Sequence, residues 1–203
     1  MDELTTSSLW VIAGVCAYGT MNHAFIGLRT PRNVTHLFFA GACVAAMVMA
    51  LSQVEMYRAP SPAALIGPLK LNLAAAIVFL CTLLPGSVAA YTELRPRSLL
   101  LALNAAALIL LAADFIAPYS LQFEDLPRLN AVRMAWGETL AIPAGRNSDW
   151  FIIGMTPVAL SLGFAIYALI NGLHGHKKTD LFGIAASSLR VGRRGSRRGG
   201  LRR

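Results

Sequence analysis

Apolar residues fall in five blocks along the chain, each about as long as a helix that crosses a bilayer. The blocks cover residues 9–28, 37–54, 71–91, 99–117 and 151–173, and charged residues are nearly absent from them. A helix needs about 20 apolar residues to cross a hydrocarbon core of roughly 30 Å. We therefore expect an all-α fold, a polytopic transmembrane helical bundle of about five spans. A further apolar stretch at residues 181–189 is too short to cross and predicts a short C-terminal stub.

A long, more polar segment, residues 118–149, separates the fourth and fifth blocks. Polar and apolar residues alternate loosely around Leu129 and Val132, and again around Leu140 and Ile142. Alternation of this kind is typical of short strands, and "PAGRNSD" contains turn residues. The segment is consistent with a small β-hairpin or with an irregular loop, and the pattern does not decide between them.

Composition agrees with an integral membrane protein. The chain has 203 residues, of which 56% are hydrophobic and 14% are charged, whereas an average soluble domain carries roughly 25% charged residues. We expect one transmembrane domain over residues 1–189 and a basic, disordered tail over residues 190–203. The acidic start of the chain, "MDELTTSS", does not resemble a signal peptide.

The basic tail accounts for most of the formal net charge of +8, since it contains seven arginines. It has no aromatic residues to stack on bases, and this disfavours nucleic-acid binding. We expect the tail to contact the anionic inner leaflet or to be neutral in function.

The loops between the apolar blocks differ in charge and predict an orientation. One set carries basic residues with few acids: Arg29, Arg32, Arg95, Arg97, Lys177 and Lys178. Short basic loops lie in the cytoplasm by the positive-inside rule. We therefore predict a bacterial inner-membrane protein with its N-terminus and residues 118–149 outside and its C-terminus in the cytoplasm.

Motifs of catalysis are missing from the sequence. It contains no G-x-x-x-x-G-K-[ST], H-E-x-x-H or G-x-S-x-G pattern, and this favours a protein that is not an enzyme. Cys16, Cys43 and Cys81 all lie in apolar blocks without a C-x-x-C pair. We interpret them as small buried hydrophobes, and we expect no cofactor.

Several residues inside the predicted spans need partners. Asp114 is the one acid within a span, about one turn from the outer end of the fourth helix. A carboxylate is costly in hydrocarbon, so we interpret it as solvated or paired with a loop arginine, with a ligand-contact or proton-linked role as the alternative. Asn72 and Asn104 are candidates for interhelical hydrogen bonds. Pro85 and Pro157 are expected to kink their helices and to free carbonyl groups.

Four histidines lie near the cytoplasmic ends of predicted helices one, two and five: His23, His36, His174 and His176. Neutral imidazole is a good ligand for metals and haem. The spacing does not define a site, because no two of them stand at i and i+4 on one helix. We interpret them as interfacial residues, with a metal- or haem-binding subunit as the alternative.

Three stretches resemble the N-terminal multi-span sensor modules of bacterial signalling proteins. The first, "YGTMNHAFIGLRTPRNVTHLFFAGACVAA", ends a helix with His-x-x-x-Gly-Leu-Arg from His23 to Arg29 and begins the next with His-Leu-x-Phe-Ala at His36. The others are "WGETLAIPAGRNSDW" and "AIYALINGLHGHKKTDLFGIAAS". The resemblance covers roughly residues 10–189.

This resemblance implies a sensory input module of the kind that precedes a histidine kinase or diguanylate cyclase domain. The chain ends before such a domain, so we expect a truncated or frameshifted receptor, or one that acts through a separate cytoplasmic signalling protein or as a homo-oligomer. The expected mechanism is a ligand-driven shift between two packings of the helices.

We take five residues in or beside the outer segment as candidate ligand-sensing residues: Arg133, Trp136, Glu138, Trp150 and Asp114. Trp136 and Trp150 are also suited to be interfacial anchors. The alternative functions are a small transporter, with Asp114 on its path, and an accessory membrane subunit.

Overall fold

A computed structural model describes residues 4–30, 34–92, 94, 96–125 and 127–171 of the chain. It contains helices α1 (Leu4–Arg29), α2 (Val34–Tyr57), α3 (Pro62–Val78), α4 (Leu84–Thr92) and α5 (Arg97–Ile116), a π-helical turn η1 (Phe79–Leu83), and strands β1 (Arg128–Arg133) and β2 (Thr139–Ala144). A last helix covers Asp149–Asn171. The stub expected at residues 181–189, the tail at residues 190–203, His174 and His176 lie outside the described residues.

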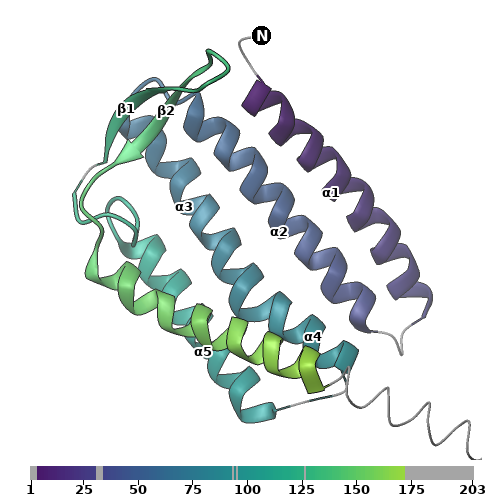
Figure 1. Cartoon of the computed structure of the whole chain (residues 1–203). Helices are drawn as coiled ribbons and strands as arrows, with labels where there is room; N and C mark the ends of the chain where they lie inside the picture. The colour runs from purple at the N-terminus through teal and green to yellow at the C-terminus, as the bar shows by residue number, and fades with distance from the viewer. Residues whose placement is uncertain (1–3, 31–33, 93, 95, 126, 172–203) are drawn as a thin grey trace, which may run out of the picture.

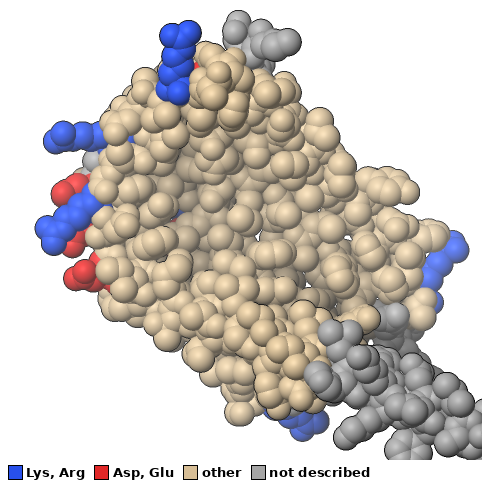
Figure 2. All heavy atoms as spheres, in the orientation of Figure 1, with Lys and Arg blue, Asp and Glu red and all other residues tan. Residues whose placement is uncertain are grey.

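Within the described residues, five helical segments are long and apolar enough to cross a membrane, and this confirms the predicted multi-pass helical fold. Four of them are α1, α2, α5 and the last helix, while α3, η1 and α4 together form the fifth, Pro62–Thr92. Figure 2 shows the charged side chains near the ends of the molecule, with a broad uncharged belt between them. The chain is therefore a multi-pass membrane protein.

The first three helices pack side by side in sequence order (Figure 1). α1 packs chiefly against α2, α2 also packs against α3, and α3 packs against α5. The β-hairpin lies over one end of α2 and α3, close to the start of α1 (Figure 1). We call this the hairpin end of the bundle and the other the opposite end. α1 is thus held along its length mainly by one helix.

The segment between α5 and the last helix contains an antiparallel hairpin, which decides between the two structures that the sequence left open. Its ladder runs from Arg128 opposite Ala144 to Arg133 opposite Thr139. The base of the hairpin is fixed to the bundle through a buried apolar cluster, against which Leu129 of β1 packs. The cluster contains Met56, Ala59, Leu65, Leu69 and Phe123.

Partners for polar groups in the spans follow the predictions in part. Proline lacks an N–H, and the helix widens into the π-helical turn η1 just before Pro85. The Leu80 carbonyl therefore lacks a backbone donor at Pro85, and the Ser161 hydroxyl of the last helix donates a hydrogen bond to it instead. Asn72 donates to the Met49 carbonyl and the Ser52 hydroxyl of α2, as predicted for an interhelical contact. The prediction was wrong for Asn104, whose amide donates to the Leu100 carbonyl of its own helix.

Candidate functional site

The turn of the hairpin positions Glu138 and depends on a glycine. Gly137 donates its N–H to the Met134 carbonyl at 2.9 Å, and the Met134 N–H donates to the Glu138 carbonyl at 2.7 Å. Gly137 has φ of +93°, a conformation that side chains disfavour. A turn followed by a glycine of positive φ is a common way to close a hairpin. Glu138 follows directly, and its side chain is buried, with 4% of the residue exposed.

The Glu138 carboxylate joins the hairpin to the first turn of α1. Its Oε2 accepts hydrogen bonds from the Thr5 backbone N–H at 2.9 Å and from the Trp136 indole N–H at 2.8 Å. Its Oε1 accepts from the Thr6 hydroxyl at 3.3 Å. We call this group, formed by Thr5, Thr6, Trp136 and Glu138, the hairpin–α1 contact.

A carboxylate suits this position for a general reason. The first N–H groups of a helix have no partner within the helix, and negative charge is favoured near a helix N-terminus. The first turn of α1 contains no acidic residue of its own. Glu138 supplies the missing acceptor from the distant hairpin.

These surroundings lower the pKa of Glu138 from its ordinary value of 4.5 to about 2. The adjacent Thr5 side chain lowers the pKa most, the Trp136 indole and the backbone N–H groups of Thr5 and Thr6 lower it further, and burial opposes them. The Thr5 hydroxyl lies beside the carboxylate but makes no hydrogen bond within the described part of the chain. The hydrogen bonds to Glu138 come from the Thr5 backbone N–H, the Trp136 indole N–H and the Thr6 hydroxyl. Glu138 is therefore a carboxylate at neutral pH.

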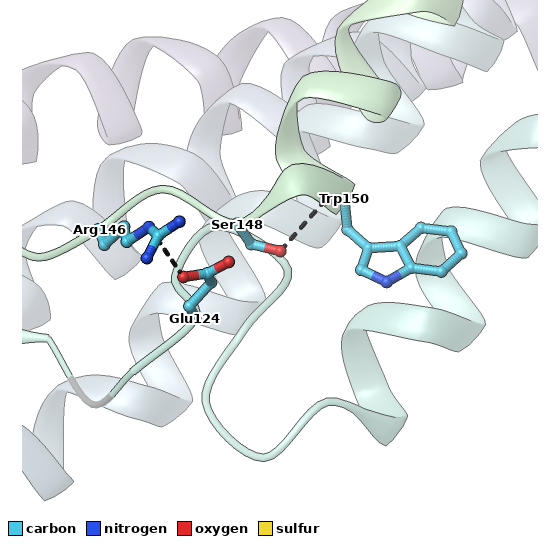
Figure 3. Close-up of polar contacts among 4 residues, drawn as sticks. All are labelled: Glu124, Arg146, Ser148 and Trp150. Atoms are coloured by element: carbon cyan, nitrogen blue, oxygen red, sulfur yellow. Dashed lines mark hydrogen bonds and ion pairs between the residues drawn. The ribbon is translucent and has the colours of Figure 1, made fainter.

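Two further candidate residues lie apart from this contact. Arg133 is exposed at the end of β1, opposite Thr139. Trp150 lies in the first turn of the last helix, where its backbone N–H donates to the Ser148 hydroxyl at 3.2 Å (Figure 3). Its indole points away from the Glu124–Arg146 ion pair (Figure 3) and borders an apolar cavity of about 50 Å³ between α3, α5 and the last helix.

Asp114 has a different environment from the one expected. It is fully buried, and its Oδ1 accepts hydrogen bonds from the Ser120 hydroxyl and the Leu121 N–H, both at 2.9 Å. The interpretation of Asp114 as solvated or paired with a loop arginine was therefore wrong. The chain turns back sharply after α5, and this brings Ser120 and Leu121 over the aspartate. Asp114 thus fixes the loop that follows α5 to the end of that helix.

Lys70 contributes to the same end of α5. Its ammonium group donates hydrogen bonds to the Phe115 carbonyl, at 3.3 Å, and to the Ala117 carbonyl. A positive charge is favoured beside the free carbonyls at a helix C-terminus. Sequence reasoning missed this role, although Lys70 stands at the edge of an otherwise uncharged block.

At the opposite end of the bundle, the structure brings together two of the four histidines. The Nδ1 atoms of His23 in α1 and His36 in α2 lie 2.9 Å apart, and the rings stack with centroids 5.2 Å apart. Phe39 stacks on His23 with centroids 5.4 Å apart. Within the part of the chain that the structure describes, no group of three or more His, Cys, Asp or Glu residues could hold a metal ion.

The five candidate residues therefore do not form one pocket. Trp136 and Glu138 join the hairpin to α1, Asp114 closes the end of α5, Trp150 borders an apolar cavity, and Arg133 is exposed on the hairpin surface.

Comparison with known proteins adds no relative to this description. No protein-family model, curated protein or solved structure matches the chain. Fold and contacts define the class as a multi-pass helical membrane protein whose hairpin, between its fourth and fifth spans, is fastened to the first.

Proposed function

We propose that the chain is the sensory input module of a membrane signalling protein, with residues 118–149 as its input surface. The observation that carries this proposal is the hydrogen bond between Glu138 and the Thr5 N–H, which are 133 positions apart in the sequence. Through this contact, a ligand that changes the hairpin also changes the restraint on α1.

The packing of α1 supports a role as the moving element. α1 packs chiefly against α2, so the hairpin–α1 contact is a distinct second restraint at its first turn. A ligand acts by favouring one of two conformations that differ in free energy by a few kcal/mol. In one state Glu138 holds the first turn of α1, and in the other the hairpin releases it. α1 then shifts along α2.

The far end of α1 is where such a shift is read. His23 and His36 pair across the interface with α2 there, and the Arg29 guanidinium lies 4.0 Å from the centroid of the Phe25 ring. Movement of α1 along α2 changes these contacts. A separate cytoplasmic signalling protein, or a second copy of the chain, reads the new arrangement.

Charge distribution supports the orientation in this proposal. Arg29 and Arg97 end α1 and begin α5 at the opposite end of the bundle. Loops rich in arginine face the cytoplasm in bacterial inner membranes. The hairpin then faces outward, where it meets ligands or envelope partners.

A reporter fusion tests the proposal. The full chain is joined at its C-terminus to a cytoplasmic diguanylate cyclase domain, and the cyclic dinucleotide is measured in cells. We expect Glu138→Gln to change the output several-fold, because it removes the charge that holds α1. Glu124→Gln is the matched control, since Glu124 pairs with Arg146 and not with α1. Equal output from the wild type and both variants, at equal expression, contradicts the proposal.

A further inference from the structure

A second polar site lies at the base of the hairpin. A cleft of about 530 Å³ opens there, lined by Asp125, Arg128, Asn130, Ala144, Gly145 and Arg146. Sites for small molecules commonly have volumes of about 300–1,000 Å³. We call this the base cleft. None of the five residues selected from the sequence lines it.

The base cleft is hollow because residues with long side chains on β1 lie opposite residues with small or no side chains at the end of β2. Arg128 and Asn130 are two positions apart on β1 and project from one face, and Ala144 is opposite Arg128 in the ladder. Gly145 follows, and a Cβ there would lie 2.9 Å from Cδ1 of the buried Phe123. The packing of Phe123 therefore keeps this wall of the cleft free of side chains.

Backbone contacts hold both sides of the base cleft in place. The Glu124 N–H donates to the Arg146 carbonyl at 3.1 Å, and Phe123 forms an antiparallel bridge with Asn147. The Arg146 Nε atom lies 3.0 Å from Oε2 of Glu124, an ion pair that Figure 3 shows beside the start of the last helix. Arg128 follows Pro127, which is fully buried.

Charge in the base cleft is balanced but not all of it is paired. Arg146 is neutralised by Glu124. Arg128 and Asp125 are both exposed, and neither has an ion pair or side-chain hydrogen bond with a described residue. A simple anion would meet Asp125, and a simple cation would meet Arg128. A molecule that carries both charges satisfies the two residues together.

We propose that the base cleft binds a small zwitterion of the free α-amino acid type, with its carboxylate on Arg128 and its ammonium group on Asp125. A guanidinium group matches a carboxylate in a bidentate geometry. The Asn130 amide offers both a donor and an acceptor to the remainder of the ligand.

The base cleft is connected to the hairpin–α1 contact by β2. Ala144 and Leu140 project from the same face of that strand, which leads directly to Glu138 at the turn. This link rests on the proposed sensory function: a zwitterion that draws Asp125 and Arg128 together alters the base of the hairpin, and the strand carries the change to Glu138.

Calorimetric titration of the purified full chain in detergent tests the binding site. The probes are the twenty standard amino acids, with acetate and methylamine as controls that each carry one of the two charges. We expect at least one amino acid to bind while acetate and methylamine do not. Arg128→Gln and Asp125→Asn are each expected to weaken binding about tenfold or more, the effect of losing a charge-assisted hydrogen bond.

Arg133→Gln is the matched control, because Arg133 lies on the same strand but does not line the base cleft. It is expected to bind as the wild type does. Arg128→Lys, which keeps the charge but not the planar fork, provides a second variant if the glutamine variant fails to fold, and it is expected to bind more weakly. Binding by no amino acid, or affinities unchanged in the Arg128 and Asp125 variants, overturns the proposal.

Glu138→Gln separates this proposal from the sensory function. It is expected still to bind the amino acid, because Glu138 does not line the base cleft, and its affinity is expected to change only by the coupling between the two sites. If an amino acid binds but the output of the reporter fusion does not respond to it, the site stands and the sensory function fails. If the output depends on Glu138 but no amino acid binds, the sensory function stands and this site fails.

Discussion

Glu138 Oε2 and the Thr5 backbone nitrogen lie 2.9 Å apart, although 133 positions separate the two residues in the sequence. The contact places a carboxylate from the hairpin at the start of the first helix. It links the two-stranded sheet of the described chain directly to a helix that packs chiefly against α2.

Acid titration of stability reports on the Glu138 carboxylate. Because its pKa in the folded protein is about 2, below the ordinary value of 4.5, ionised Glu138 stabilises the fold above pH 4.5. This contribution is lost as the pH falls from 4.5 towards 2. We expect Glu138→Gln to have a lower Tm than the wild type at pH 7, and the difference to shrink through this window. A Tm difference that does not depend on pH contradicts the assignment.

A substitution at Trp136 distinguishes the contribution of its aromatic ring from that of its hydrogen bond to Glu138. Trp136→Phe keeps an aromatic ring but removes the N–H that donates to Glu138 at 2.8 Å. A hydrogen bond to a charged group contributes roughly 1.5–3 kcal/mol to stability. Because the Trp136 side chain is half-exposed, we expect the variant to lose an amount of unfolding free energy at or below the lower end of this range. Thermal unfolding in detergent measures it. Trp150→Phe is the control, because its indole N–H forms no hydrogen bond within the described residues, and its Tm is expected to change less.

Asp114 is expected to act in structure and not in transport. Asp114→Asn keeps an oxygen acceptor for Ser120 and Leu121, and we expect normal folding. Asp114→Ala leaves the buried Leu121 N–H without its partner, at a cost of about 1–3 kcal/mol, measured by thermal unfolding. Equal stability of the two variants contradicts this role. Loss of a transport activity in a normally inserted Asp114→Asn variant favours the transporter alternative.

Helix packing at Gly86 gives a test of the bundle itself. A Cβ at Gly86 would lie 2.4 Å from Cε1 of Phe38, at the contact between α4 and α2. Gly86→Ala is therefore expected to destabilise the protein by about 1–3 kcal/mol. Gly14→Ala is the matched control, because a Cβ at Gly14 meets nothing within 4 Å. It is expected to leave the Tm unchanged or slightly raised, and an equal loss in both variants contradicts the described packing.

The spans could be predicted from the sequence because each is a local property. An apolar block of sufficient length has few stable alternatives to a membrane helix, and all five appear. The third begins at Pro62 and not near residue 71, since Ser61 caps it and proline suits the first turn of a helix. The hairpin was harder to predict, because its alternation is short and interrupted.

Long-range contacts could not be predicted in the same way. No local pattern connects Glu138 with Thr5, and the burial of Asp114 depends on how the chain turns back after α5. The pairing of His23 with His36 left a usable signal. His23 lies six positions before the end of α1 and His36 two positions after the start of α2, so both lie near the connection between these two antiparallel helices.

Distance measurement between spin labels tests whether Glu138 restrains α1. Labels are attached to cysteines at Met21 of α1 and Leu101 of α5, two exposed positions near the opposite end, after replacement of Cys16, Cys43 and Cys81. In lipid nanodiscs at pH 7, Glu138→Gln should shift or broaden the distance distribution, whereas Glu124→Gln should reproduce the wild type. Three superimposable distributions would show that Glu138 does not set the position of α1, and would contradict the proposed function.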